Sequence, residues 1–279
     1  MPRRPPPIRR WLTAATWPVG VALTSWDYMW RITPLHRREV CEADTDGHLP
    51  PPLPAAIDHD EIVGPDGGHG PLFHRRYRTA IAGAEVDAAG LMARLRADLN
   101  RAAPTTFARF QRVLGEDGPV RAGDEFVVRM PGPWDGPVRV VTADDRSFRL
   151  ATLAGHLEAG QIEFRALDRG DGGCGGSDGS TRSAGEADST AGEADFTAGE
   201  ADFTAGSHCS GDCAAVAFEI ESWARSADRL ADLLYHRIRM AKEVQLHMWI
   251  SFLEGVAALA GGRIVGGVDI DTRRVEPVP

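Results

Sequence analysis

The chain has 279 residues, and 43% of them are hydrophobic, which is enough to bury a substantial core and excludes wholesale disorder. The net charge of -9 is concentrated in residues 171–213, where nine acidic residues and one arginine give -8. The rest of the chain sums to -1, which excludes a global field that would recruit nucleic acid. Lys242 is the only lysine, so arginine usage is biased and a single arginine is weak evidence for a phosphate site.

Residues 1–40 form a basic, tryptophan-rich segment with three interpretations. Its seven arginines outnumber two acidic residues, and basic residues beside tryptophans suit an anionic membrane interface. Such a weak membrane-surface contact would use Arg3, Arg4, Arg9, Arg10 and Trp11. The uncharged run at 11–26 is shorter than a bilayer span. A signal peptide would need a small-x-small cleavage site, and this segment has no clear one. We favour a segment that packs on the domain surface through its tryptophans.

Residues 41–71 are predicted to be a linker, because prolines at 50–54 and glycines at 64–70 break regular elements. A domain over residues 72–262 follows. Its first expected elements are a strand at 73–81, a helix at 85–99, and a second helix at 105–114 that is bounded by a proline and a glycine. Alternating segments bounded by turn signals predict further strands at 125–130, 138–142, 148–153, 161–166 and 216–223.

An insertion at 171–213 interrupts this domain with the seven-residue units AGEADST, AGEADFT and AGEADFT. Each unit has a glycine and at most one large apolar residue, which cannot build a coiled-coil seam, so we expect a disordered acidic loop. His208, Cys209 and Cys213 could ligate zinc, but their Gly- and Ser-rich flanks and the lack of a paired C-x-x-C motif argue against it. We therefore expect no metal and no cofactor.

A long helix is predicted from Ser226 to about Ala260, followed by a C-terminal tail at 263–279. One apolar stripe of this helix consists of Leu230, Leu234, Ile238, Ala241, Val244, Met248, Phe252 and Leu259. A second strip on the opposite side consists of Leu246, Ile250, Leu253 and Ala257. A helix with two apolar faces needs two partners. We expect the sheet on the first face and the tryptophan-rich N-terminal segment on the second.

About six strands followed by a long helix predict an α+β fold, with a curved antiparallel sheet wrapped around the C-terminal helix. The run ATLAGHLEAGQIEFRA at 151–166, followed by VAFEIESWARSAD and the long helix, resembles the bacterial and plant family called domain of unknown function nineteen-ninety. The matching signature consists of Gly155, His156, Glu158, Gly160 and Phe164. The resemblance covers roughly residues 73–260 without the insertion, and the N-terminal segment departs from typical members. It implies a START-like, helix-grip architecture with a ligand cavity, and it implies no particular activity.

His156 and Glu158 are candidates for an acid–base pair, because residues two apart on an extended segment point to the same side. An alternative gives them a structural role. Gly155 and Gly160 would then frame a tight turn, and the two side chains would bond the backbone of that turn.

Four further residues are candidates for ligand contacts. Gln245 and Arg237 lie within the angular range of the first apolar stripe, where a polar group that faces a cavity must be satisfied. Arg129 is carried by a predicted strand, and Trp134 lies in a loop at the mouth of the proposed cavity.

Together these features predict a cytoplasmic START-like protein that binds a small apolar or amphipathic molecule between the sheet and the C-terminal helix. Two alternatives stay open. One is an enzyme that uses the same cavity, with His156 and Glu158 as acid and base. The other is a peripheral membrane or scaffold protein that acts through residues 1–40. We expect no nucleic-acid partner.

Overall fold

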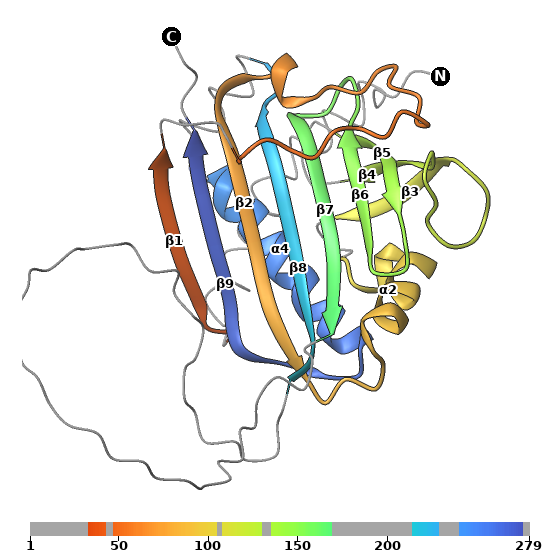
Figure 1. The fold of residues 1–279 in the computed structure, drawn as a ribbon, viewed down its shortest axis with the longest axis vertical. Coiled ribbons are helices and arrows are strands. Elements are labelled where there is room, and N and C mark those ends of the chain that lie inside the picture. Colours follow the sequence, from red (N-terminus) through yellow and green to blue (C-terminus); the bar gives the residue numbers. More distant parts are fainter. Residues whose placement is uncertain are drawn as a thin grey trace, which may run out of the picture.

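The computed structural model describes residues 33–42, 47–104, 108–129, 135–168, 214–228 and 240–275. These residues form a sheet-dominated α+β fold with a nine-stranded mixed sheet, α-helices α2 (Ala88–Ala97) and α4 (Met240–Leu259), and short 3-10 turns η1 (Pro65–Gly67) and η2 (Leu99–Arg101) (Figure 1). The strands are β1 Leu35–Glu42, β2 His69–Ala82, β3 Arg109–Leu114, β4 Glu125–Arg129, β5 Gly136–Ala143, β6 Ser147–Thr152, β7 Glu158–Asp168, β8 Ala214–Ser226 and β9 Arg263–Val275. The expected α+β class is confirmed, whereas the expected number of about six strands was too low.

The strand order is β1-β9-β2-β8-β7-β6-β5-β4-β3, and every pair is antiparallel except β1 with β9. Strand β9 lies between β1 and β2, so most of the segment predicted as a C-terminal tail is part of the sheet. Its pairing with β2 shifts register between Thr79 and Ala80, close to Gly266 and Gly267, which have φ of 73° and 89°. Two adjacent left-handed glycines interrupt the alternation that marks a strand, which explains why the pattern was missed.

Strand β3 corrects a second prediction, because residues 109–114 were expected to belong to a helix. They pair with β4 instead. The side chain of Asn100 supports this extended backbone, since it accepts from the N–H of Phe110 at 2.8 Å and donates to its carbonyl at 2.9 Å. Phe110 is the inward-facing residue of the strand, and Gly115, with φ of 120°, ends it. The glycine that was expected to end a helix therefore ends a strand.

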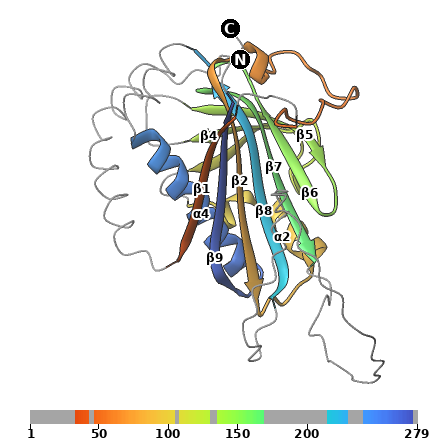
Figure 2. The ribbon, with the colours of Figure 1, turned by 60° about the vertical axis from the view of Figure 1, so that its left-hand side comes forward.

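Both helices cover the same, concave face of the sheet (Figure 2). An aromatic cluster holds α4 there. The Phe164 ring of β7 stacks on Phe148 at 4.6 Å between centroids and contacts Phe252 and Trp249 of α4 at 5.3 and 5.7 Å. Burying side chains of this size contributes on the order of 2–3 kcal/mol each, so the cluster fixes the C-terminal half of α4 against the sheet.

The two apolar strips that were expected on the last helix, α4, are both part of the same hydrophobic core. Leu246, Ile250 and Leu253 are buried in the same cluster as Phe252 of the other strip. The second partner of α4 includes the η2 region, because a Cβ on Gly255 would lie 2.2 Å from the Ala102 carbonyl oxygen.

The expected brace by the N-terminal segment falls largely on residues 1–32, which lie outside the described part of the chain. Just beyond them, the Thr33 hydroxyl donates to Glu254 of α4 at 2.7 Å. Part of the same segment also enters the sheet, since strand β1 begins at Leu35.

Residues 47–63, here called the strap, cross the convex face of the sheet and are folded onto it, although a linker was predicted here (Figure 1). Sheet side chains donate to strap carbonyls: Gln161 to Pro51 at 3.3 Å, Arg149 to Pro52 at 3.2 Å and Arg139 to Asp60 at 2.9 Å. The strap is thus held mainly through its backbone.

Neither helix in the described part of the chain is both long and apolar enough to span a bilayer.

Candidate functional site

A polar cluster joins the sheet to α4 inside the otherwise apolar interior. Arg75 of β2 donates from Nη1 to the Gln245 side-chain oxygen at 3.2 Å. The Gln245 amide nitrogen donates to both carboxylate oxygens of Glu158, at 3.1 and 3.2 Å. Arg75 Nη1 also lies 4.0 Å from Glu158 Oε1. These three residues, here called the inner cluster, bring together β2, β7 and α4.

Alternation along β2 explains why a charged residue points inward. Residues 75 and 77 share a face, and Tyr77 belongs to the hydrophobic core. The Arg75 side chain is only 7% exposed, and its guanidinium lies 4.6 Å from the centre of the Phe73 ring. A buried charge needs a compensating partner, and the carboxylate of Glu158, whose side chain is 20% exposed, supplies it.

His156 and Glu158 are close in sequence, yet their side chains bind different partners. The Glu158 N–H donates to His156 Nδ1 at 2.8 Å, whereas the Glu158 carboxylate binds Gln245. The His156 ring packs against Gly136, where a Cβ would lie 2.9 Å from Nε2. Burial lowers the pKa of His156, although nearby Glu158 opposes the shift, so the ring is held neutral. The His156 ring thus bonds the backbone of the turn, as the structural alternative expected, whereas the Glu158 carboxylate does not and binds α4 instead.

The remaining predicted contact residues do not join the inner cluster in the described part of the chain. Arg129 forms an ion pair with Asp135 and donates from Nε to the Gln111 side chain at 3.1 Å. Trp134 and Arg237 lie outside the described residues, as do the arginines and Trp11 of the expected membrane contact. Sequence reasoning identified Gln245 and missed Arg75, although the alternation around Tyr77 placed that arginine on the inward face.

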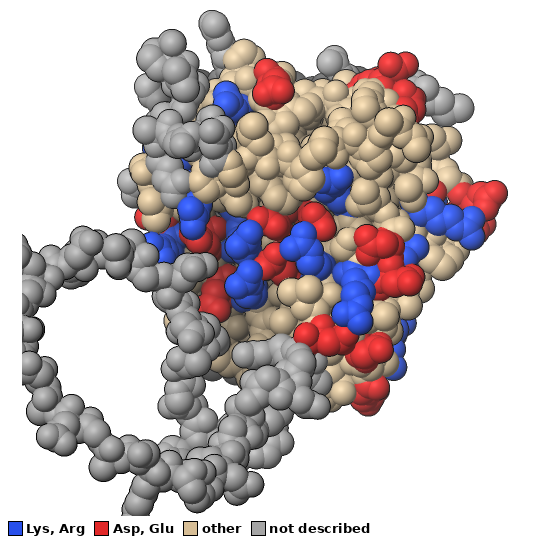
Figure 3. Space-filling model, viewed as in Figure 1, with Lys and Arg blue, Asp and Glu red and all other residues tan. Residues whose placement is uncertain are grey.

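The convex face carries a band of alternating charges across its centre (Figure 3). Cross-strand neighbours pair directly: Arg76 Nη2 lies 2.6 Å from Glu221 Oε1, and Arg78 Nη2 lies 2.6 Å from Glu219 Oε2. His74 Nε2 lies 2.8 Å from the same Glu221 oxygen. Burial alone would raise the pKa of Glu221, but the hydrogen bonds from His74 and Arg76, together with the arginine charge, lower it to about 2.

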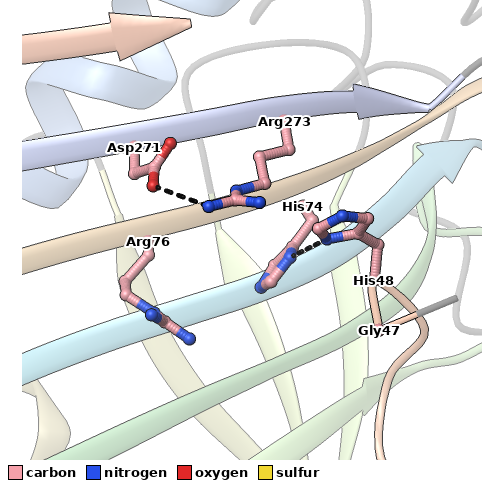
Figure 4. Close-up of a pocket in the computed structure, with 6 residues that line it drawn as sticks. All are labelled: Gly47, His48, His74, Arg76, Asp271 and Arg273. Carbon is pink, nitrogen blue, oxygen red and sulfur yellow. Dashed lines mark hydrogen bonds and ion pairs between the residues drawn. The ribbon is translucent and has the colours of Figure 1, made fainter. Parts of the chain in front are cut away.

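A pocket of about 220 Å³ opens on this convex face, where the strap meets β2 and β9 (Figure 4). It is lined by Gly47, His48, His74, Arg76, Asp271 and Arg273. His48 Nδ1 lies 3.1 Å from His74 Nδ1, and the His74 ring stacks on Trp223 with 5.3 Å between centroids. Sequence reasoning missed this pocket because it assigned His48 to a linker and residues 263–279 to a tail.

Metal-ligand clusters of three or more His, Cys, Asp or Glu side chains do not occur among the described residues. Cys41 is an exposed free thiol on β1. The histidine and cysteines that were weighed as a zinc site lie in 171–213, outside the described ranges.

Comparisons with known proteins leave the family open. No family model matches the chain, and no curated protein gives a significant match. The solved structure titled "Crystal structure of Ara h 8.0201" is similar with a TM-score of 0.34 and 8% sequence identity, over 67% of this chain and 97% of that one. At this TM-score the likeness carries no conclusion about family or ligand.

Proposed function

We propose that the protein binds a small amphipathic molecule between the concave face of the sheet and α4, in a helix-grip arrangement. The observation that carries the proposal is the inner cluster, which places a guanidinium, a carboxylate and an amide together on the helix-facing side of the sheet. Ligand sites commonly combine apolar walls with a few convergent polar groups.

The charges of the inner cluster indicate the kind of polar group that it would receive. Arg75 and Glu158 offset each other at 4.0 Å, and Gln245 is neutral. An added carboxylate or ammonium would upset this balance, because a further buried charge needs its own counter-charge. A hydroxyl or amide can donate to Glu158 and accept from Arg75. The proposed ligand is therefore uncharged at its polar end.

The surroundings suit an apolar body. Phe73 lies under Arg75, Tyr77 is the next inward residue on β2, and Trp249 lies one turn beyond Gln245 on α4. The two halves of α4 are attached differently. The aromatic cluster around Phe164 binds the C-terminal part, whereas hydrogen bonds bind the region of Gln245. A ligand could replace these hydrogen bonds without opening the aromatic core.

Membership of the domain of unknown function nineteen-ninety family stays part of this proposal. Its support is the curved sheet with α4 on the concave face and the turn at Gly155 within the signature run, where φ is 98°. Cytoplasmic location and weak membrane contact through residues 1–40 also stay predictions.

The test uses the neutral fluorescent probe N-phenyl-1-naphthylamine, displaced by decanol or by decanoate, which differ in the charge of their polar end. We expect both to displace the probe from the full chain, with decanol effective at the lower concentration. Mass spectrometry of compounds released on denaturation would then identify a natural ligand. Failure of the probe to bind, or stronger displacement by decanoate, would contradict the proposal.

A matched pair of variants assigns the site. Gln245→Leu removes the amide of the inner cluster, and Gln111→Leu makes the same change at an exposed position on β3. Decanol displacement should weaken about fivefold or more in Gln245→Leu, as expected for one or two lost hydrogen bonds, and should be unchanged in Gln111→Leu. Equal behaviour of the two variants would place the probe elsewhere.

A further inference from the structure

We propose that the ligand of the inner cluster carries a carboxamide, or another neutral group with an N–H beside a C=O such as a lactam or a urea, and that this group takes the place of the Gln245 side chain. The inference rests on the proposed function, which requires only that the polar end of the ligand be uncharged. The observation that carries it is that the cluster already holds a carboxamide, that of Gln245, between a donor and an acceptor.

The bonds of Gln245 show what the two charged groups of the cluster bind. Its side-chain oxygen accepts from Arg75 Nη1 at 3.2 Å, and its amide nitrogen donates to the two Glu158 oxygens at 3.1 and 3.2 Å. A guanidinium only donates and an ionised carboxylate only accepts, so a carboxamide fits between them in this one orientation. Hydrogen bonds to charged groups are stronger than those between neutral groups. The pair thus recognises a donor and an acceptor side by side.

The sheet alone brings the guanidinium and the carboxylate together. Register places Arg75 opposite Ser222 of β8, and Glu158 opposite Ser226 of the same strand. The residue of β8 that lies between these serines on the same face is Ala224. Its small side chain leaves room for the long arginine side chain to extend toward the carboxylate.

Each of the two charged residues also has a contact that does not involve Gln245. The Arg75 guanidinium lies 4.6 Å from the centre of the Phe73 ring. The Glu158 N–H donates to His156 Nδ1 at 2.8 Å, which fixes the backbone that carries the carboxylate. A donor and an acceptor 4.0 Å apart therefore stay in place when the Gln245 carboxamide leaves. Groups that are held in position before binding reduce the ordering cost of forming a complex.

Exchange of one carboxamide for another conserves the hydrogen bonds of the cluster. Gln245 is half-buried and the Glu158 side chain is 20% exposed, so the exchange takes place at the accessible side of the cluster. The apolar body of the ligand then supplies the net affinity. An ester accepts from Arg75 but has no N–H, so the bonds that Glu158 receives from Gln245 would be lost without replacement.

The experiment extends the displacement of N-phenyl-1-naphthylamine from the full chain to decanamide and methyl decanoate. The two compounds are neutral and similar in size, but only the amide carries N–H groups. The ester enters apolar surroundings more readily, so a site that recognises the apolar body alone would favour the ester. We expect decanamide to displace the probe at a concentration about tenfold lower than methyl decanoate, because only the amide donates to Glu158.

A variant tests whether the ligand amide and Gln245 compete for one place. Gln245→Ala removes the internal carboxamide and, unlike leucine at this position, opens the space that it occupies. Decanamide should therefore act at a concentration roughly threefold to tenfold lower on Gln245→Ala than on the unmodified protein, which corresponds to about one hydrogen bond. Gln111→Ala makes the same change at an exposed position on β3 and should leave the displacement by decanamide unchanged.

Unfolding temperatures give a second measurement if Gln245→Ala is less stable. Decanamide should raise the unfolding temperature of this variant more than that of the unmodified protein. Displacement by methyl decanoate at an equal or lower concentration, or no gain for decanamide on Gln245→Ala, would overturn this inference. If decanol still displaces the probe, either of these results leaves the proposed function standing, whereas failure of the probe to bind the unmodified protein contradicts both.

Discussion

Replacing Glu221 by glutamine tests whether the buried ion pairs of the convex face stabilise the fold. The Glu221 side chain is 7% exposed and receives hydrogen bonds from both Arg76 and His74. Glutamine keeps the shape and removes the negative charge. Because the partners stay in place, Glu221→Gln leaves the Arg76 guanidinium without the carboxylate that it contacts at 2.6 Å.

The magnitude follows from the pKa of Glu221. Its ordinary value of 4.5 falls to about 2 in the folded chain, and at about 1.4 kcal/mol per pKa unit this difference corresponds to about 3 kcal/mol. The folded state holds its carboxylate ionised more strongly than the unfolded chain does. This stability is therefore fully present above about pH 4.5 and is lost as the pH falls toward about 2.

The assay is urea unfolding of the unmodified protein and of Glu221→Gln from about pH 7 down to about pH 2.5. We expect the variant to be less stable by about 3 kcal/mol at neutral pH and the difference to shrink steadily below about pH 4.5. Glu116→Gln is the matched control, because Glu116 also contacts an arginine, Arg121, at 2.6 Å but is 83% exposed. That control should cost less than about 0.5 kcal/mol throughout. A difference for Glu221→Gln that is small at pH 7, or that does not change with pH, would refute the reasoning.

Three further predictions follow from packing and burial. Gly160→Ala should lower the free energy of unfolding by at least about 2 kcal/mol in denaturant unfolding, because its Cβ would lie 1.9 Å from the Trp223 carbonyl oxygen. The control Gly64→Ala, which has open space around it, should leave that free energy nearly unchanged. Phe164→Ala should cost about 3–5 kcal/mol by the same assay, since three aromatic rings lose their common partner. A histidine NMR titration should give His156 a pKa below its ordinary 6.5. This residue therefore destabilises the fold as the pH falls through the range in which the unfolded chain binds the proton.

The strands that sequence reasoning found are those with an uninterrupted alternation. Strand β8 shows Val216, Phe218 and Ile220 buried in the core. Strands β5, β6 and β7 were placed within a few residues of their observed ends. Strand β1 was missed because its sequence, LHRREVCE, is mostly polar and pairs at the edge of the sheet. Strand β9 was missed because two glycines interrupt its pattern. Long-range pairing between the two ends of the chain cannot be derived from local periodicity.

The inner cluster could be predicted in part. Gln245 was singled out because a polar residue on an apolar helix stripe needs a partner, and Glu158 because it lies two residues from His156 on an extended segment. Arg75 was passed over because the abundance of arginine made each one uninformative, so the face it occupies was not weighed. The pocket with His48 and Arg273 is built from two segments that were predicted to be a linker and a tail. Local patterns in the sequence therefore gave no indication that these two segments lie close together.

The strap shows how a proline-rich segment can still be held specifically. Proline has no N–H to donate, but its carbonyl is an ordinary acceptor, and at Pro51 and Pro52 the sheet supplies the donors, Gln161 and Arg149. The contact thus depends on where the backbone carbonyls of Pro51 and Pro52 lie, and not on their side chains. Many sequences could follow this path, provided that they keep the extended conformation that proline favours. This contact therefore constrains Gln161 and Arg149 of the sheet, whereas the side chains at positions 51 and 52 are free to vary.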